Sequence, residues 1–265
     1  MATKNCCFKG RGEIAVVDYA QAIKKTAGLI AVGNASLCQV NLTERKENVR
    51  DYTSSAGGMD CSSREIDEVE VAITLLCSSA ENLAMGLYGV GTTGNVATAA
   101  VPSEQKVAWP GAIVPLDDLA DTDVAIVVKN IAGSTTYTPG TDYEVTQAGS
   151  IRLLAGTTIP SPTISAGVGQ PNIAVTYTRR DQSLVQLVRR SSKPVLMHFD
   201  GINIMDGNRP AYFGLYRVLF GPAKSFSALS DNVSQLELVG TVTKDPTKPV
   251  GTAAAPLSQY GTLRI

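Results

Sequence analysis

The chain has 265 residues, of which 44% are hydrophobic and 18% are charged, and its net charge at pH 7 is −1. This composition is typical of an ordered globular protein and argues against a disordered chain or a nucleic-acid binder with a basic face. No stretch approaches the ~18 apolar residues of a membrane span, and the N-terminal sequence lacks the apolar core of a signal peptide. The five cysteines are odd in number and show no CxxC spacing. We therefore expect a reducing cytosol during synthesis, and neither a disulfide framework nor a zinc site.

Residues 33–43 and 65–76 alternate apolar and polar side chains, which is the period of a strand with one buried and one solvated face. Residues 44–63 lie between these two strands and are polar and glycine-bearing. This pattern predicts a hairpin with an unusually long loop, and loops of that length are usually functional or mobile. The polar side chains expected on the solvated faces are Gln39, Asn41, Thr43, Glu68 and Glu70.

Ser79 is predicted to be the N-cap of the best helix in the chain, AENLAMGLYG, with Gly89 as its stop. Residues 18–25 form a weaker helix candidate, and residues 90–108 are small and polar, which predicts a linker. The side chains expected to pack the main helix are Leu83, Met85 and Leu87.

From Trp109 onward, short apolar runs alternate with turn residues at a spacing of about 8–12 residues, which is typical of an all-β sandwich. We therefore predict an all-β module at 105–180, inserted into a first domain made of 1–104 and 181–265. The alternative is that these runs add further strands to one large sheet. The strands predicted within the module are 124–129, 143–146, 150–154 and 172–178.

After residue 180 the first pattern returns, and the last predicted strand, 233–244, again alternates apolar and polar residues. The tail that follows, DPTKPVGTAAAPLSQYGTLRI, has three prolines and no periodicity. Such an end is usually disordered unless a neighbouring subunit holds it. The other strands predicted in this part are 184–189, 195–204 and 211–220.

No pattern in the chain predicts catalysis. His198 is the single histidine and is flanked by Met and Phe, as a packed strand residue would be. The string at 89–94 matches GxGxxG, but a helix precedes it and a linker follows, the reverse of the context that dinucleotide binding requires. The aspartates at 117–123 lack the spacing of a calcium loop. We therefore expect no enzyme, no catalytic residues, no cofactor and no metal.

Three strings together resemble the major tail tube protein of long-tailed bacteriophages. One is VGNASLCQVNLTERKE, a strand that runs into a charged segment, and another is REIDEVEVAITLLCSSAENLAMGLYG, a strand that leads directly into a helix. The third is GTDYEVTQAGSIRLL followed by NIAVTYT, a strand, glycine turn and strand. The resemblance spans most of the chain, and its motifs are patterns rather than fixed ligand sets.

The resemblance implies a mainly-β fold: a tail-tube-type β-sandwich or barrel with one flanking helix, plus an inserted Ig-like or similar module. Six copies would form a ring, and stacked rings would form the tail tube through which DNA is ejected. Gln39, Asn41, Thr43, Glu68 and Glu70 would face the lumen, because a conduit for DNA should present acidic or neutral groups rather than Lys or Arg. The implied inter-ring loop comprises Arg45, Lys46, Glu47, Arg50, Asp51 and Tyr52.

The implied partners are other copies of the chain and other tail proteins, namely the tape measure, the tail terminator and tail-tip proteins. DNA would pass through without specific binding, no membrane would be involved, and the protein would reside in the virion tail. The rival hypothesis is a β-rich receptor- or glycan-binding module or a tail-tip component, with a sheath or capsid decoration protein between the two. Sugar sites favour exposed aromatic platforms, and the single Trp and nine scattered Tyr weaken that rival without excluding it.

Overall fold

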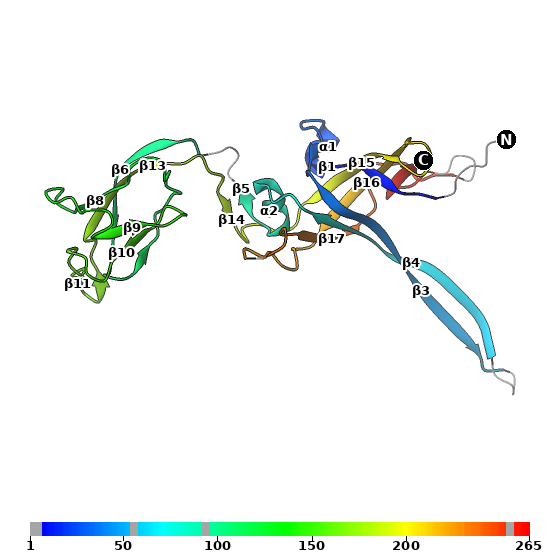
Figure 1. The fold of residues 1–265 in the computed structure, drawn as a ribbon. Helices are drawn as coiled ribbons and strands as arrows, with labels where there is room; N and C mark the ends of the chain where they lie inside the picture. The colour runs from blue at the N-terminus through cyan, green and yellow to red at the C-terminus, as the bar shows by residue number, and fades with distance from the viewer. Residues whose placement is uncertain (1–6, 54–57, 92–95, 230, 253–256) are drawn as a thin grey trace. The chain divides into compact units, whose positions relative to one another are not determined.

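The computed structural model describes residues 7–53, 58–91, 96–229, 231–252 and 257–265. Strands hold 48% of the residues and helices 5%, which confirms the predicted mainly-β class. The chain divides into two compact units (Figure 1). Unit 1 contains the residues up to Gly91 together with Val185–Ile265, and unit 2 is Thr92–Leu184.

Unit 1 is built on an eight-stranded antiparallel sheet with the strand order β2-β1-β15-β16-β17-β4-β3, and β18 pairs with β16 beside this path. A separate two-stranded ribbon joins β5 to β14. The strands are β1 (Gly10–Asp18), β2 (Ile30–Ala31), β3 (Ala35–Asp51), β4 (Gly58–Leu75), β5 (Val90–Gly91), β14 (Val185–Gln186), β15 (Pro194–Asn203), β16 (Arg209–Phe220), β17 (Leu236–Val242) and β18 (Gly261–Arg264).

The core of unit 1 lies on one face of this sheet, because alternate residues of each strand point to the same side. The predicted alternation is confirmed in β4 from Val69 to Leu75 and in β17, where every second residue is buried and all of these except Gly240 are aliphatic. Burial of each such side chain contributes about 1.5–3 kcal/mol before the loss of chain entropy is counted. The most deeply buried members are Val71, Ile73, Leu75, Met197, Val218, Leu236 and Leu238.

Helix α2 (Ala80–Gly86) packs on the core side of the sheet and follows the predicted N-cap. The Ser79 hydroxyl accepts a hydrogen bond from the Asn82 backbone N–H, as the sequence predicts. A Cβ added at Gly86 would lie only 3.0 Å from Leu238 Cδ2, so this glycine allows the helix to approach the sheet closely. The helix ends at Gly86, three residues before the predicted stop, and Gly89 belongs to its C-terminal cap, because the Gly89 backbone N–H donates a 2.9 Å hydrogen bond to the Ala84 carbonyl oxygen.

Helix α1 (Tyr19–Lys24) confirms the weaker helix candidate. The Asp18 carboxylate caps it by accepting a hydrogen bond from the Ala20 backbone N–H. The helix ends at Lys24, and the C-cap residue Lys25 has a left-handed φ of 54°.

The predicted long loop at 44–63 is wrong, because β3 and β4 remain paired through most of it. Pairing runs from Ala35 opposite Leu75 to Asp51 opposite Gly58, and residues 54–57 lie outside the described part of the chain. Figure 1 shows the two strands continuing as a ribbon beyond the rest of the sheet. We call residues 44–51 and 58–66 the arm. Both faces of the arm are solvated, so its side chains are mostly polar on both sides, and the few apolar ones, Val49, Met59 and Ile66, form no regular period that would predict strands.

The disordered tail predicted after residue 244 is wrong for the residues that the structure describes. Strand β18 pairs with β16, and the side chain of Asp245 is only 2% exposed. Its carboxylate accepts hydrogen bonds from the Tyr19 hydroxyl at 2.6 Å and from the backbone and hydroxyl of Thr247. This segment is held by polar contacts and strand pairing rather than by an apolar period, and residues 253–256 of the prediction lie outside the described residues.

Unit 2 holds two three-stranded sheets, β7-β10-β9 and β6-β13-β8, and the hairpin β11-β12. Both three-stranded sheets contribute to one core, which includes Tyr143, Ile151, Val128 and Ile173. Its strands are β6 (Ala99–Lys106), β7 (Ile113–Val114), β8 (Val127–Asn130), β9 (Tyr143–Val145), β10 (Ile151–Leu153), β11 (Ile164–Ser165), β12 (Val168–Gly169) and β13 (Ile173–Arg179).

The boundaries of unit 2 differ from the predicted module at 105–180. Residues 99–106 were expected to be a linker, but they form β6, which pairs with β13 along most of its length. The end moves from 180 to Leu184, because Gln182 pairs with Val96 and its amide contacts the Asp118 carboxylate. Most residues of β6 are small or polar and exposed to solvent, so the sequence shows no apolar period there that would predict a strand.

Candidate functional site

The five polar residues predicted for the two strand faces lie on one face of the sheet. In the register of β3 and β4, Asn41 is directly opposite Glu70 and Thr43 is directly opposite Glu68. Directly opposed residues share a face, so Gln39, which is opposite Ala72, belongs to the same surface. We call this surface the polar face. Gln39 and Thr43 are exposed on it, and the other three polar residues are half-buried.

Strand β17 extends the polar face by one more strand. Thr241 is opposite Glu70, and its hydroxyl donates a 2.9 Å hydrogen bond to Glu68 Oε1. Val239 is opposite Ala72, and the next row adds Glu237 opposite Thr74. The alternation of β17 was visible in the sequence, but nothing in it showed that this strand lies beside β4. None of these positions on β3, β4 and β17, from Gln39 to Thr43 and across, carries Lys or Arg.

The opposite face of the same strands is apolar and packs into the core. Val69, Val71 and Ile73 are buried there, and Val40 packs against the core cluster. Cys38 lies among them, and burial raises the pKa of its thiol to about 11. The sheet therefore separates an aliphatic interior from an acid-bearing exterior across its own thickness.

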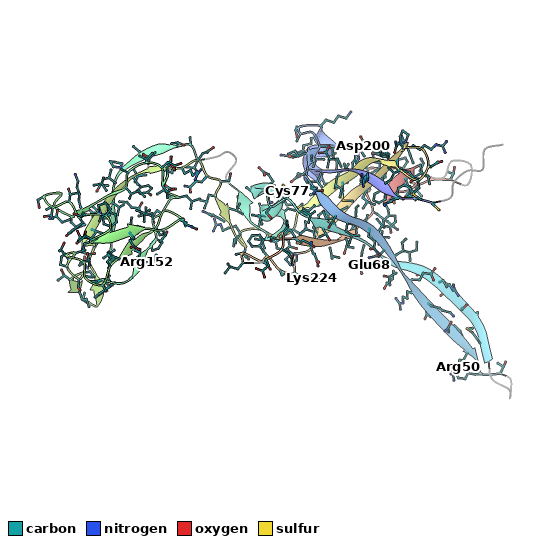
Figure 2. All side chains as sticks on the ribbon, viewed as in Figure 1. Arg50, Glu68, Cys77, Arg152, Asp200 and Lys224 are labelled. Carbon is teal, nitrogen blue, oxygen red and sulfur yellow. The ribbon has the colours of Figure 1, made fainter. Side chains whose placement is uncertain are left out.

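The residues predicted for the inter-ring loop lie instead on the arm, in strand β3. Arg45, Lys46, Glu47 and Arg50 are exposed, Asp51 ends the strand, and Tyr52 follows it with 87% of its surface exposed. Figure 2 shows Arg50 near the end of the ribbon and Glu68 close to where the ribbon joins the sheet. Both faces of the arm are therefore exposed to solvent, and no other described residue covers their side chains.

The three side chains predicted to pack the helix are only half-buried. Met85 packs against the core cluster, whereas the fully buried positions of α2 are Asn82, Ala84 and Gly86. Small residues form the contact because the helix lies close to β17, and a short helix with small contact residues lacks the apolar stripe that the prediction assumed.

A cavity of about 720 Å³, lined by both apolar and polar groups, opens between the two ends of the strand order in unit 1. Its lining comes from β1, β3, β15, β16 and β18, so the sheet curves until β1 and β3 approach each other. Within the described chain, residues 10–13 of β1 and the outer edge of β3 have no strand partner on this side. The apolar lining includes Phe8, Ile14, Leu37, Val40, Phe213 and Leu263.

The side chains with catalytic potential do not form a catalytic arrangement in the described residues. His198 is half-buried in β15, its Nε2 lies 3.0 Å from the Tyr212 hydroxyl, and burial lowers its pKa despite the nearby Asp200. Over the described part of the chain, no group of three or more His, Cys, Asp or Glu side chains is placed to hold a metal ion. Of the GxGxxG string, Val90 and Gly91 pair with β14, and residues 92–95 lie outside the described residues.

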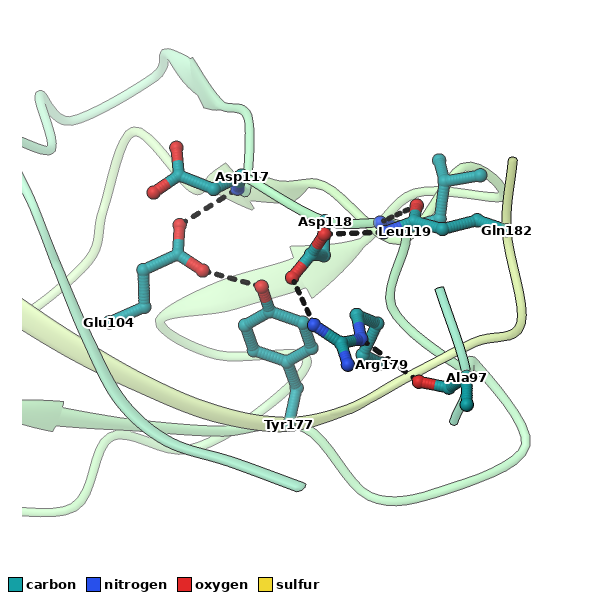
Figure 3. A network of polar contacts seen from close by, with 8 residues as sticks. All are labelled: Ala97, Glu104, Asp117, Asp118, Leu119, Tyr177, Arg179 and Gln182. Atoms are coloured by element: carbon teal, nitrogen blue, oxygen red, sulfur yellow. Dashed lines mark hydrogen bonds and ion pairs between the residues drawn. The ribbon is translucent and has the colours of Figure 1, made fainter. Parts of the chain in front are cut away.

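Two of the clustered aspartates hold unit 2 together (Figure 3). Asp117 accepts a hydrogen bond from Lys106 Nζ at 2.6 Å, and Asp118 contacts Arg179 and the amide of Gln182. Glu104 accepts from the Asp117 backbone N–H at 2.9 Å and from the Tyr177 hydroxyl. These contacts fasten the loop before β8 to β6 and β13, so these groups act as structural anchors.

No helix in the described residues is long and apolar enough to cross a membrane. No curated protein matches the chain. A family model described as "Protein of unknown function UCP028589" matches residues 7–264, and the chain belongs to that family.

Proposed function

We propose that this protein is a structural virion subunit of long-tailed bacteriophages. In this proposal, six copies form a ring, and rings stack into the tail tube through which DNA is ejected. The sheet of unit 1 is a tail-tube-type β-sandwich or barrel, and unit 2 is an Ig-like or similar module carried by it. The protein has no substrate and no cofactor in this role. Its partners are its own copies and other tail proteins.

The polar face is the observation that carries the proposal. A DNA conduit must pass a polyanion without retaining it, and Lys or Arg on its wall would bind phosphates. The polar face carries Glu68 and Glu70 among neutral groups and has no cation from Gln39 to Thr43 and across β4 and β17. The lumen is therefore assigned to this face, with Gln39, Asn41 and Thr43 beside the two glutamates.

Three further features support assembly with copies of the same chain. Unpaired strand edges favour pairing with another chain, and closing a sheet into a ring removes them. The cavity between β1 and β3 leaves apolar groups such as Phe8 and Leu263 partly exposed, with 56% and 62% of their surfaces accessible. The arm continues β3 and β4 beyond the rest of the sheet, where a single copy does not cover them.

Imaging the purified full-length protein at rising concentration by negative-stain electron microscopy tests the proposal. We expect rings and then tubes. A protein that stays monomeric at every concentration would contradict the proposal and favour the receptor- or glycan-binding alternative.

A deletion tests whether unit 2 is dispensable for assembly. Gly91 and Val185 are direct cross-strand partners in the β5-β14 ribbon, so an Asn-Gly turn can join them as a hairpin. We expect the chain with residues 92–184 replaced by this turn to form the same rings and tubes as the intact chain. Loss of assembly with a folded unit 1 would show that unit 2 belongs to the ring contact.

A further inference from the structure

The arm carries opposite charges on its two faces. Lys46 is directly opposite Arg64, and Arg50 lies four residues further along β3, so these three cations share one face with the carboxylate of Glu44. We call this face of the arm the basic face. Three cations outweigh one carboxylate among these four positions, and every one of these side chains is exposed. The exposed Ile66 and Met59 lie on the same face, and Asp67, at the register shift beside Ile66, is assigned to neither face.

The other face of the arm has the reverse balance. Glu65 is directly opposite Arg45, Glu47 is opposite Ser63, and Glu68 follows at the base of the arm. We call this the acidic face: within the arm it carries two carboxylates against one cation among positions with described side chains, and Glu68 adds a third carboxylate at its base. It is continuous with the polar face, because the pair Thr43 and Glu68 of the polar face lies directly beside the pair Arg45 and Glu65 on the same side of the ribbon.

The charge pattern of the basic face is unfavourable in a single copy. Directly opposed side chains on one face of an antiparallel pair have Cβ atoms about 4.5–5.5 Å apart, and like charges there are destabilising. Lys46 and Arg64 stand in that relation, and among the described side chains Glu44 offsets it, 3.9 Å from the Arg64 guanidinium. An anionic surface laid on this face would relieve the repulsion and gain new ion pairs.

We infer that the basic face of one arm binds the acidic face of the arm of a second copy. The inference rests on the proposed function, because it names the contact through which neighbouring copies associate. Both faces belong to one element, so each copy offers one of each and the contact is heterologous. A heterologous contact repeats from copy to copy, and it closes into a ring when the rotation permits.

A second copy fits the arm better than a nucleic acid does. Phosphates would match Lys46, Arg50 and Arg64, but the same ribbon presents Glu47 and Glu65 on its other side, and these would repel the polyanion. The arm of another copy complements both faces at once, with an equal length of ribbon and an opposite charge balance.

Two charge-reversed variants of the full-length chain test the inference. K46E/R64E makes both faces acidic, and E47K/E65K makes both faces basic. Like charges brought together at an interface cost several kcal/mol, so each variant alone should require at least about a hundredfold higher concentration to assemble in sedimentation velocity. An equimolar mixture should recover assembly, because each basic arm then meets an acidic one. Assembly of the wild type should also weaken with added salt.

R152E/K224E is the matched control, because it reverses two exposed cations that are not part of the arm, one in β10 and one after β16, and changes the net charge as K46E/R64E does. It should assemble like the wild type, and circular dichroism should show that all variants are folded. Failure of the mixture to recover assembly would overturn the inference, as would normal assembly of either variant alone. Normal assembly with loss of binding to a labelled DNA duplex in K46E/R64E would assign the basic face to nucleic acid instead. A wild type that never assembles would contradict the proposed function itself.

Discussion

Asn82 joins three segments of unit 1 through its side-chain amide. The side chain is 3% exposed, and its Nδ2 donates hydrogen bonds of 2.8 Å to the carbonyl oxygens of Val32 and Cys77. These two carbonyls follow β2 and β4, and Asn82 itself lies in α2. The amide therefore supplies the donors for two buried acceptors where strands and helix meet, and these acceptors would otherwise be unpaired.

Asn82→Asp keeps the shape of the side chain and removes both donors. It places a carboxylate oxygen against the two carbonyls, and each buried group left unsatisfied costs about 1–3 kcal/mol. We expect the free energy of unfolding of unit 1 to fall by about 3 kcal/mol or more at pH 7. That loss corresponds to a fall of roughly 6–12 °C in the melting temperature. Asn82→Ala is the control and should lose less, because it adds no charge.

Differential scanning calorimetry combined with tryptophan fluorescence measures this effect in one unit at a time. Trp109 is the only tryptophan and lies in unit 2, so its transition should not move in the Asn82→Asp variant. The loss in the free energy of unfolding of unit 1 should shrink as the pH falls, because burial raises the folded-state pKa of the new carboxyl and its protonated form regains one hydrogen-bond donor. A unit 1 transition that matches the wild type at pH 7 would refute this account of Asn82.

Three further predictions concern the stability of the two units. Leu238→Ala should lower the free energy of unfolding of unit 1 by about 2–5 kcal/mol in urea titrations, because the side chain is fully buried beneath α2. Glu104→Gln should lower that of unit 2 by about 1.5–3 kcal/mol, measured by Trp109 fluorescence, because charged hydrogen bonds are lost. Hydrogen bonds from the Thr138 backbone N–H and then from Thr158 hold the pKa of Asp142 below its usual value. The ionised Asp142 carboxylate therefore stabilises unit 2 fully above pH ~4, the pKa of the group in the unfolded chain, and this stabilisation is lost as the pH falls through the lower pKa of the folded state. Asp142→Asn should weaken this acid dependence of the free energy of unfolding.

The sequence predicts the strands of this protein best where one face of a strand is buried. The alternation of Val69, Val71 and Ile73 against Glu68 and Glu70 places both faces of β4 correctly within the sheet. The cap at Ser79 is also readable, because a hydroxyl before a helical segment has a specific backbone partner.

The arm, the tail and β6 could not be predicted in the same way. The arm is solvated on both faces, so its strands are held by the ladder with each other and show no apolar period. The tail is held by Asp245 and by pairing with β16, contacts between residues far apart in the chain. The addition of Thr241 and Glu237 to the polar face depends on which strands are neighbours, and local sequence does not determine strand order.

A three-dimensional reconstruction of the assembled protein by electron cryomicroscopy tests whether the polar face lines a channel. We expect stacked rings around a channel wide enough for duplex DNA, with Glu68 and Glu70 on the channel wall and the arms in contact between copies. An assembly that places Glu68 and Glu70 on the outer wall, or away from any channel, would contradict this expectation.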